Sequence, residues 1–501
     1  MAKIKSFYIE NFKGIEATNI SISDRIDTPI ITLIGLNESG KTTVLEALSH
    51  FVSGDAIVAK IFEETGPATK ALSLIPIHKK ANFTGDIKVG ARIALDTADI
   101  DAIKERGQKH GLDILEAPLR QEINVWRQYA FSDGNLDAKR TGARWDIDLQ
   151  VRKPKAKHYT DYTSPADGVS LNTEVWKIVL SRLPSISYFP TFLVEMPDRI
   201  YISHHDDETS KNRYYRSVLQ SVLDSLNEGL DLDTHVAERI FEYHKANQTA
   251  TWISTFWGTQ SKSQVQSVFQ KASNAISREI IGSWNKIFHR PTSAKSISLD
   301  WNIDTEKGNL PYVTFNVSDG ESQYALHERS LGFRWFFSFL LFTRFKQSHD
   351  GETIFLFDEP AANLHALAQS ELLDSFNKIV EGGHKVVYST HSHHMIEPRW
   401  LSGAYIIENR AIDYENDFGG LNSRPTDILA KPYRQFVSEF PDRVSYYQPV
   451  IEKLGSYSIK LAPEKPVVVT EGITDFHALS AICGKTLKTM KFDLVPGLGA
   501  G

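Results

Sequence analysis

The sequence predicts an α/β fold in which a parallel sheet is interrupted by a long, mostly helical insertion and is followed by the start of a second α/β unit. An apolar, β-branched run at 29–34 leads through a glycine-rich loop into a helical pattern at 44–48. Two further apolar runs, at 354–357 and 385–390, end in polar residues, as buried parallel strands do. A last apolar run at 467–470 follows a Pro-Glu-Lys-Pro break, which marks a domain boundary.

The bulk composition describes a globular protein of several domains. The chain has 501 residues, of which 41% are hydrophobic and 24% charged, and this length suggests about three domains. The single cysteine, Cys483, excludes internal disulfides and favours a cytoplasmic location. No apolar run approaches the ~20 residues of a membrane span, and the N-terminus leads into a strand pattern rather than a signal peptide, so no membrane partner is expected. Because the formal net charge is -6, a nucleic-acid site must be a local basic patch.

Pattern and composition divide the chain into five segments. The stretch from 208 to 290 is mostly helical by pattern and is expected to form an arm or lid between two parts of one α/β domain. A polar connector then precedes the C-terminal unit. In order, the predicted segments are 1–200, 201–295, 296–410, 411–463 and 464–501.

The glycine-rich loop at 35–43 reads Gly-Leu-Asn-Glu-Ser-Gly-Lys-Thr-Thr and has the strand–loop–helix context of a phosphate-binding P-loop. Its glycines let backbone N–H groups close around a phosphate, and the helix that follows adds a positive dipole end. Lys41 can reach the β- and γ-phosphates of a nucleotide, and the Thr42 hydroxyl can bind Mg²⁺. We therefore predict a nucleotide site, and its binding residues are Asn37, Gly40, Lys41, Thr42 and Thr43.

Two acids follow the apolar run at 354–357. Asp358 and Glu359 lie at the C-terminal end of a strand, where open α/β sheets bind ligands. Asp358 is suited to the Mg²⁺ shell, and Glu359 is suited to orienting or deprotonating an attacking water. The next apolar strand, 385–390, ends at His391, which can reach a γ-phosphate. The alternatives are solvated acids and a surface histidine, and the P-loop upstream favours the functional interpretation.

A serine and a glycine stand before a strongly apolar helix at 335–341. Ser330 is suited to capping the N-terminus of that helix, which explains the serine structurally. The same helix N-terminus can also bind a phosphate, and in that case Ser330 and Gly332 are nucleotide-binding residues. The residues alone leave both interpretations open.

Together these motifs resemble the ATP-binding-cassette (ABC) ATPases of the chromosome-maintenance and DNA-repair type. The strand and turn at 9–15, the wide gap between the P-loop and Ser330, and a D-loop-like segment at 360–365 extend the resemblance. It implies an ABC-type P-loop ATPase head in which Ser330 and Gly332 form a signature motif that acts on ATP held by a second subunit. It therefore implies a homodimer through the heads, or a higher oligomer built from it, with ATP and Mg²⁺ as cofactors and nucleic acid as a partner.

The C-terminal segment narrows the resemblance. The strand at 467–470 ends in Glu471-Gly-x-x-Asp475, and a second strand pattern follows at 492–496. This is similar to the first half of a Toprim domain, and an ABC ATPase followed by Toprim resembles the OLD (overcoming lysogenisation defect) family of ATPase-nucleases. The resemblance implies a nuclease in antiviral defence, in which Glu471 and Asp475 are catalytic and bind Mg²⁺ or Mn²⁺. Hydrolysis of ATP through Glu359 and His391 would control it.

The chain departs from the OLD pattern in two places. Near the D-loop, Ala361 replaces a glutamate, only His365 of a histidine pair is present, and Ala366 replaces a proline. The Asp-x-Asp pair that completes a Toprim metal site is missing before Gly501. We therefore expect either a native chain that continues past Gly501 or a remnant that cannot cut. In the second case the protein is an ATPase scaffold or sensor that holds and releases a separate effector protein.

Three further features have the residue types of a binding site, and each has a simpler explanation. The basic run at 152–158 could contact a phosphate backbone, but a solvated loop is the better explanation. The His-His-Asp-Asp run at 204–207 has metal-ligand types, but neighbouring ligands in a short turn point apart, so an exposed loop is expected. Trp252, Phe256 and Trp257 could stack on bases, but packing in a core or an interface is simpler.

Overall fold

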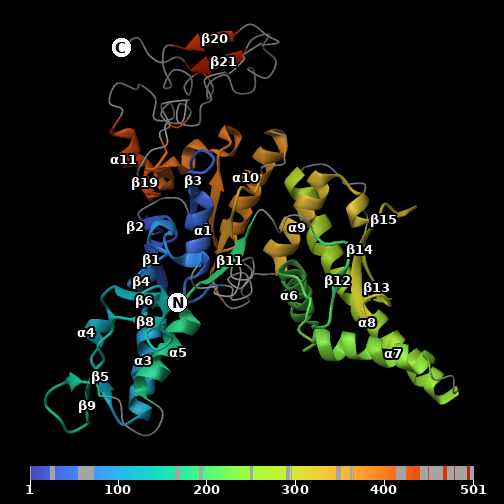
Figure 1. Cartoon of the computed structure of the whole chain (residues 1–501), viewed down its shortest axis with the longest axis horizontal. Helices are drawn as coiled ribbons and strands as arrows, with labels where there is room; N and C mark the ends of the chain where they lie inside the picture. The colour runs from blue at the N-terminus through green and yellow to red at the C-terminus, as the bar shows by residue number, and fades with distance from the viewer. Residues whose placement is uncertain are drawn as a thin grey trace.

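The computed structural model has a central α/β region from which one lobe descends on each side (Figure 1). The structure describes residues 2–22, 29–54, 73–163, 170–190, 196–248, 252–288, 294, 296–345, 351–361, 364, 366–412, 425–439, 450, 467–470, 479 and 493–496. The first lobe follows the N-terminal strands and contains α3, α4 and α5, and the second contains α6 to α9 with β12 to β15 (Figure 1).

The central sheet is the predicted parallel sheet. Its order is β11 (Ser185–Phe189), β16 (Thr353–Phe357), β17 (Lys385–Thr390), β3 (Ile30–Ile34), β18 (Tyr405–Asn409) and β19 (Ile428–Pro432). Every neighbouring pair is parallel except β18 with β19. All residues of β3 and β16 are buried, as in strands that are covered on both faces. The strands predicted from the three apolar runs are therefore confirmed.

The strand register brings the predicted site residues to one edge of this sheet. β3 and β17 end together, because Ile34 pairs with Thr390. β16 lies on the other side of β17 and runs in the same direction. Gly35, Asp358 and His391, which follow β3, β16 and β17, therefore emerge side by side at the carboxyl ends of the strands, where open parallel sheets bind ligands.

The N-terminal lobe is an antiparallel sheet with helices beside it. Its strands are β1 (Lys3–Phe12), β2 (Ile15–Ser21), β4 (Gly85–Ala94), β6 (Ile123–Ser132), β7 (Asn135–Leu136) and β8 (Gly142–Trp145), and a smaller sheet joins β5 (Asp113–Ile114), β9 (Gln150–Arg152) and β10 (Thr160–Asp161). The helices of this lobe are α3 (Thr97–Lys109), α4 (Glu116–Leu119) and α5 (Leu171–Arg182), and α1 (Lys41–Ser49) lies between this sheet and the central one. Helix α1, which follows the P-loop, contacts both β1 and the central strands β11, β16 and β17, so it joins the two sheets.

The second lobe combines helices with another antiparallel sheet. Its strands are β12 (Ile200–Tyr201), β14 (Leu310–Ser318) and β13 (Ser296–Asp304), with β15 (Gln323–Ala325) also paired to β14. Its helices are α6 (Ser210–Asp224), a π-helical turn (Asp233–Ala237), α7 (Glu238–Gln248) and α8 (Trp252–Phe288), which lie within the stretch 208–290. The backbone N–H of Leu299 in β13 donates to the Ser273 hydroxyl of α8 at 2.9 Å, so these helices rest on a sheet that the next segment provides.

Helices α9 (Leu331–Phe345) and α10 (Ala366–Glu381) pack on the central sheet through aromatic side chains. Phe339 of α9 and Phe376 of α10 both contact Phe357 of β16, with ring centroids 5.2 and 5.3 Å apart. Burying a side chain of this size contributes about 1.5–3 kcal/mol. Phe357 therefore holds both helices on the strand that leads into the acid pair.

The C-terminal strands are present where the sequence predicts them. β20 (Val467–Thr470) and β21 (Asp493–Pro496) pair in parallel. Glu471 and Asp475 lie outside the described residues. The remaining short elements are 3-10 turns at Ile77–Lys79, Leu326–Glu328, His393–Met395 and Pro398–Gly403, and helix α11 (Tyr433–Val437). Within the described part of the chain, no helix is long and apolar enough to cross a membrane.

Candidate nucleotide-binding and hydrolysis site

The P-loop has a backbone that only glycine fits at its last turn. Gly40 is the N-cap of α1 and has φ +99°, in the left-handed region. A Cβ atom at this position would lie 2.5 Å from Cδ1 of Ile428 in β19. The conformation of the loop therefore depends on the turn at Gly40 and on its contact with β19. The backbone N–H groups at the start of a helix such as α1 can bind a phosphate.

Lys41 makes three polar contacts within its own site. Its Nζ donates to the carbonyl oxygens of Gly35 at 2.9 Å and Leu36 at 2.8 Å. It also forms an ion pair with Glu359 Oε1 at 3.1 Å, and the Lys41 side chain is only 6% exposed. The cation is thus held at the mouth of the loop, where the P-loop and the acid pair meet.

Thr42 and Asp358 together offer the oxygen ligands that Mg²⁺ prefers. The Thr42 hydroxyl donates to both carboxylate oxygens of Asp358, at 3.1 and 3.0 Å. Burial raises the pKa of the Asp358 carboxyl, while hydrogen bonds from Ser389 and Thr42 act in the opposite direction. A desolvated carboxylate beside a hydroxyl suits a small, hard cation that takes its other ligands from water and phosphate. Within the described residues no group of three or more His, Cys, Asp or Glu side chains could hold a metal ion.

Glu359 lies between Lys41 and His391. One carboxylate oxygen contacts Lys41, and the other lies 2.8 Å from Nδ1 of His391. Its backbone has φ +46°, a conformation that costs a side-chain-bearing residue about 1–3 kcal/mol and that is concentrated at functional sites. Glu359 is therefore fixed in a strained backbone with both oxygens engaged.

The sequence interpretation missed Ser389, which fixes both acids. The Ser389 hydroxyl accepts from the backbone N–H of Glu359 at 2.8 Å and donates to Oδ1 of Asp358 at 2.8 Å. It is fully buried near the end of β17. The sequence signal for Ser389 is its position near the end of the apolar run at 385–390, two residues before His391.

The other predicted nucleotide-binding residues lie around this centre with fewer contacts. Asn37 is exposed on the loop, and Thr43 is half-buried in the first turn of α1. Ser330 caps α9, because its hydroxyl accepts from the N–H of Phe333 at 3.3 Å, as the structural interpretation predicts. A Cβ atom at Gly332 would lie 3.9 Å from the Leu364 side chain, so the N-terminus of α9 borders the segment that follows the acid pair.

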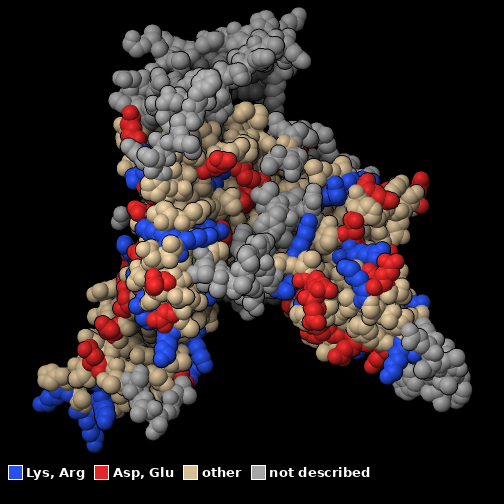
Figure 2. All heavy atoms as spheres, viewed as in Figure 1, with Lys and Arg blue, Asp and Glu red and all other residues tan. Residues whose placement is uncertain are grey.

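The basic run at 152–158 lies at the end of the N-terminal lobe. Figure 2 shows Lys and Arg side chains gathered there, around the connection between β9 and β10. Arg152 is paired with Asp113 at 2.7 Å and stacks on Tyr159, whereas Lys153, Lys155 and Lys157 are exposed. The structure is compatible with a solvated loop and with a phosphate-binding loop, and both remain predictions.

The remaining two features are the His-His-Asp-Asp run at 204–207 and the aromatic residues at 252–257. His204 contacts Arg216 at 2.8 Å and His205 contacts the carbonyl oxygen of Ser203, as expected for an ordinary loop. The side chains of Trp252, Phe256 and Trp257 lie outside the described part of the structure.

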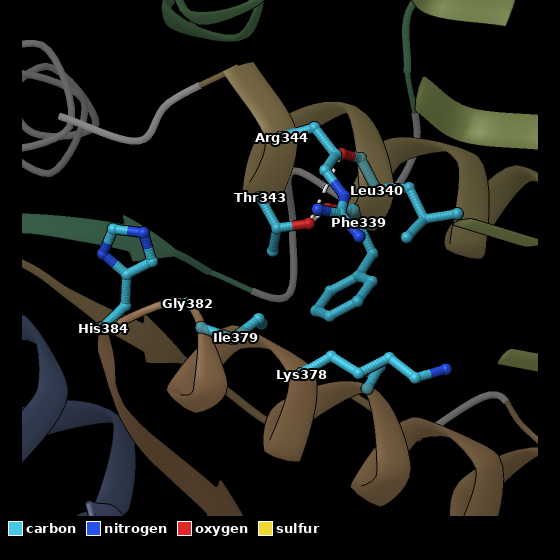
Figure 3. A pocket seen from close by; sticks show the side chains of 9 residues that line it. Phe339, Leu340, Thr343, Arg344, Lys378, Ile379, Gly382 and His384 are labelled. Carbon is cyan, nitrogen blue, oxygen red and sulfur yellow. Dashed lines mark hydrogen bonds between the residues drawn. The ribbon is translucent and has the colours of Figure 1, made fainter. Parts of the chain in front are cut away.

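A separate small pocket lies between α9 and α10 at the other end of the sheet. It has a volume of about 110 Å³, and Figure 3 shows Arg344, Lys378 and His384 among the residues that line it. His384 stands immediately before β17, whereas His391 follows that strand. The pocket is therefore at the opposite ends of the strands from the P-loop and is not part of the nucleotide site.

The parallel sheet, the P-loop and the Asp358–Glu359 pair define the class of P-loop ATPases. A family model described as "AAA ATPase domain" matches residues 2–396. The chain belongs to this family, and the match spans both the P-loop and His391. A search among curated proteins finds no match.

Two solved structures are similar over most of the chain. One is a Smc head bound to the C-winged helix domain of ScpA, with 12% identity, 86% of this chain and 97% of that chain covered, and a TM-score of 0.38. The other is a Smc head domain with an extended coiled coil bound to the C-terminal domain of ScpA, from Pyrococcus furiosus, with 11% identity, 88% and 99% covered, and a TM-score of 0.38. At these values the similarity supports no conclusion about activity or partners.

Proposed function

We propose that the protein is an ATP-hydrolysing switch whose P-loop binds the nucleotide and whose acid pair carries out hydrolysis. The observation that carries this proposal is the chain of contacts from Lys41 to Glu359 to His391, beside the Thr42–Asp358 pair. These contacts support the proposal, because they bring together a cation, a carboxylate suited to act as a base and oxygen atoms suited to Mg²⁺.

Each residue has a role that follows from its chemistry. Lys41 and the N–H groups at the start of α1 bind the phosphates, and Thr42 with Asp358 would hold Mg²⁺, which supplies charge neutralisation at the phosphates. Glu359 accepts a proton from the attacking water, and His391 orients the Glu359 carboxylate. Ser389 keeps the two acids at their mutual distance. The test is ATP hydrolysis by the purified protein with and without Mg²⁺, and a protein that binds ATP without ever hydrolysing it would contradict the proposal.

A head-to-head homodimer is the second part of the proposal. It is supported by the exposed face at the start of α9, where Ser330 is exposed and the large apolar side chain of Leu331 is 39% exposed. In the dimer Ser330 and Gly332 of one subunit would contact ATP held by the other. Light scattering of the Ser330→Arg variant tests this: the native protein is expected to dimerise with ATP, and the variant is expected to stay monomeric while it still binds ATP.

Control of a metal-dependent Toprim nuclease is the third part, and it rests on the OLD resemblance. The parallel pairing of β20 with β21 supports it, because the connection from Thr470 to Asp493 is long enough for the crossover that parallel strands need. Glu471 and Asp475 would then bind Mg²⁺ or Mn²⁺ at the end of β20, and nucleic acid would be the substrate. The role in antiviral defence stays a prediction of that resemblance.

A further inference from the structure

One buried side chain on α10 joins the two segments that follow the catalytic strands. Nε2 of Gln369 donates to the carbonyl oxygens of Ala361 at 3.1 Å and Leu364 at 3.0 Å. Oε1 of Gln369 accepts from the Ser392 hydroxyl at 2.9 Å. Gln369 is 8% exposed, so these contacts satisfy an amide that has little access to water.

Both segments lead directly to the site. Ala361 lies two residues after Glu359, and Ser392 directly follows His391. Since Glu359 and His391 also contact each other at 2.8 Å, the contacts form a closed ring that runs through Gln369. Gln369 is therefore connected to the Glu359–His391 pair through both segments.

The same ring reaches the N-terminus of α9. The Leu364 side chain lies against Gly332, with 3.9 Å between its Cδ2 and the position of a Cβ at residue 332. Leu331, beside Gly332, is one of the exposed large apolar residues. The N-terminus of α9 is thus connected to the segment beside His391 by successive contacts through Leu364, Gln369 and Ser392.

We propose that Gln369 is a positioning residue that makes the orientation of His391 depend on the positions of the Ala361 and Leu364 carbonyl groups. The proposal rests on the hydrolysis function proposed above and adds a regulatory input to it. An amide is the side chain that this place requires, since it must donate to two carbonyl groups and accept from a hydroxyl at once. Glutamate cannot donate to the carbonyl groups, and methionine of similar length makes none of the three hydrogen bonds.

The first test is kinetic. Gln369→Met is expected to lower kcat for ATP about tenfold and to leave KM for ATP within about twofold, because the phosphate-binding residues are untouched. Ser370→Ala, at an exposed position on the same helix, is the matched control and should keep the native kcat. A native kcat in Gln369→Met would overturn the proposal.

The second test asks whether Gln369 acts through His391. In a double-mutant cycle, Gln369→Met is expected to cause no further loss of kcat in a His391→Ala background. If the loss in the double variant were the product of the two single losses, Gln369 would act independently of His391, and the proposal would be wrong. Ser392→Ala, which removes only the last hydrogen bond, should behave like Gln369→Met with a smaller effect.

The third measurement requires neither ATP binding nor hydrolysis, so it separates this proposal from the proposed function. The NMR signals of the His391 ring are identified by their loss in His391→Ala. They should shift in Gln369→Met and in Ser392→Ala and stay unchanged in Ser370→Ala, while the thermal midpoints report whether each variant is folded. Unchanged His391 signals in the two folded variants would refute the coupling even if the protein were an active ATPase. Shifted signals in a protein that hydrolyses no ATP would instead refute the proposed function alone.

Discussion

The Glu359 carboxylate occupies a hydrogen-bonding position on Lys41 that a phosphate oxygen would also need. The three donors of the Lys41 ammonium group are directed at two loop carbonyls and at Glu359. A phosphate oxygen that accepts from Lys41 must replace one of these acceptors. In the proposed mechanism a phosphate that replaced the carboxylate would release Glu359 to accept a proton from water, which would link phosphate binding to activation of the base.

The first prediction concerns this ammonium group. Lys41→Ala should weaken ATP binding by about 10- to 100-fold, because hydrogen bonds to a charged group contribute about 1.5–3 kcal/mol each. Isothermal titration calorimetry measures the effect, and Lys80→Ala, which removes an exposed lysine, is the control. If both variants bound ATP equally well, Lys41 would not be the phosphate ligand.

The second prediction concerns the base. Glu359→Gln should lower ATP turnover by about 10²- to 10⁴-fold, the usual contribution of a general base. It should also bind ATP at least as tightly as the native protein, because the ion pair that holds Lys41 is weakened, and so it should accumulate in the ATP-bound state. Turnover is followed by phosphate release and the bound state by filter binding. Native turnover in this variant would show that another group activates the water.

At the scale of secondary-structure elements, the C-cap of helix α1 is a buried histidine, His50. His50 directly follows α1, and its Nδ1 lies 2.9 Å from the Tyr129 hydroxyl of β6. Burial, and then the charges of Arg127 and Lys13, lower the pKa of His50 from 6.5 to about 3. Between about pH 6.5 and 3 the ring is therefore neutral in the folded protein, whereas the unfolded chain protonates it.

The third prediction is a pH dependence of stability. Between pH 6.5 and 3 the unfolded chain binds a proton at His50 that the folded chain does not, so the free energy of unfolding should fall as the pH falls through this range. Between pH 7.5 and 5.0 this one group should remove about 2 kcal/mol. Urea unfolding of native protein and of His50→Gln measures it. The native protein should lose more stability than the variant, with exposed His158→Gln as the control. Parallel pH profiles for the native protein and His50→Gln would contradict the assignment.

The sequence predicts the strands of the central sheet well, because full burial in a parallel sheet requires continuous apolar runs such as 354–357. It also predicts that the residues after those strands converge, since parallel strands share one carboxyl edge. Ser389 and Gln369 could not be found in this way. Their importance comes from hydrogen bonds to segments that are distant in sequence, and neither residue type has a spacing that distinguishes it from an ordinary buried polar residue.

At the scale of the whole molecule, the question is which activity the proposed ATPase controls. The fourth prediction is that the C-terminal unit cleaves nucleic acid in a metal-dependent reaction that requires Glu471. With Mg²⁺ or Mn²⁺ the native protein should cleave, and Glu471→Ala should lose at least about 10²-fold of the rate, since metal-assisted cleavage needs carboxylate ligands. Glu464→Ala is the control. ATP hydrolysis should be the same in all three proteins. Cleavage that survives in Glu471→Ala, or that is missing in the native protein, would favour the ATPase scaffold with a separate effector.

The sequence predicts the arrangement of the lobes less well than it predicts the strands of the central sheet. The helices at 210–288 are evident from their periodicity, but the pattern says nothing of the surface that they cover. The structure shows that α8 packs on β13 through side-chain hydroxyls such as Ser273, which are polar contacts that hydrophobic periodicity does not detect. The N-terminal lobe is similar, because its long antiparallel strands are paired across wide sequence gaps.

The position of β3 has a consequence for the order of events during synthesis. The strand that carries the P-loop lies between β17 and β18, so neither of its neighbours exists until roughly 350 residues after Ile34 have been made. At about 5–20 residues per second this is a delay of about 20–70 s. During that time the P-loop also lacks Ile428, the side chain that lies against Gly40. A nascent chain is therefore expected to be unable to bind ATP until β17, β18 and Ile428 have left the ribosome.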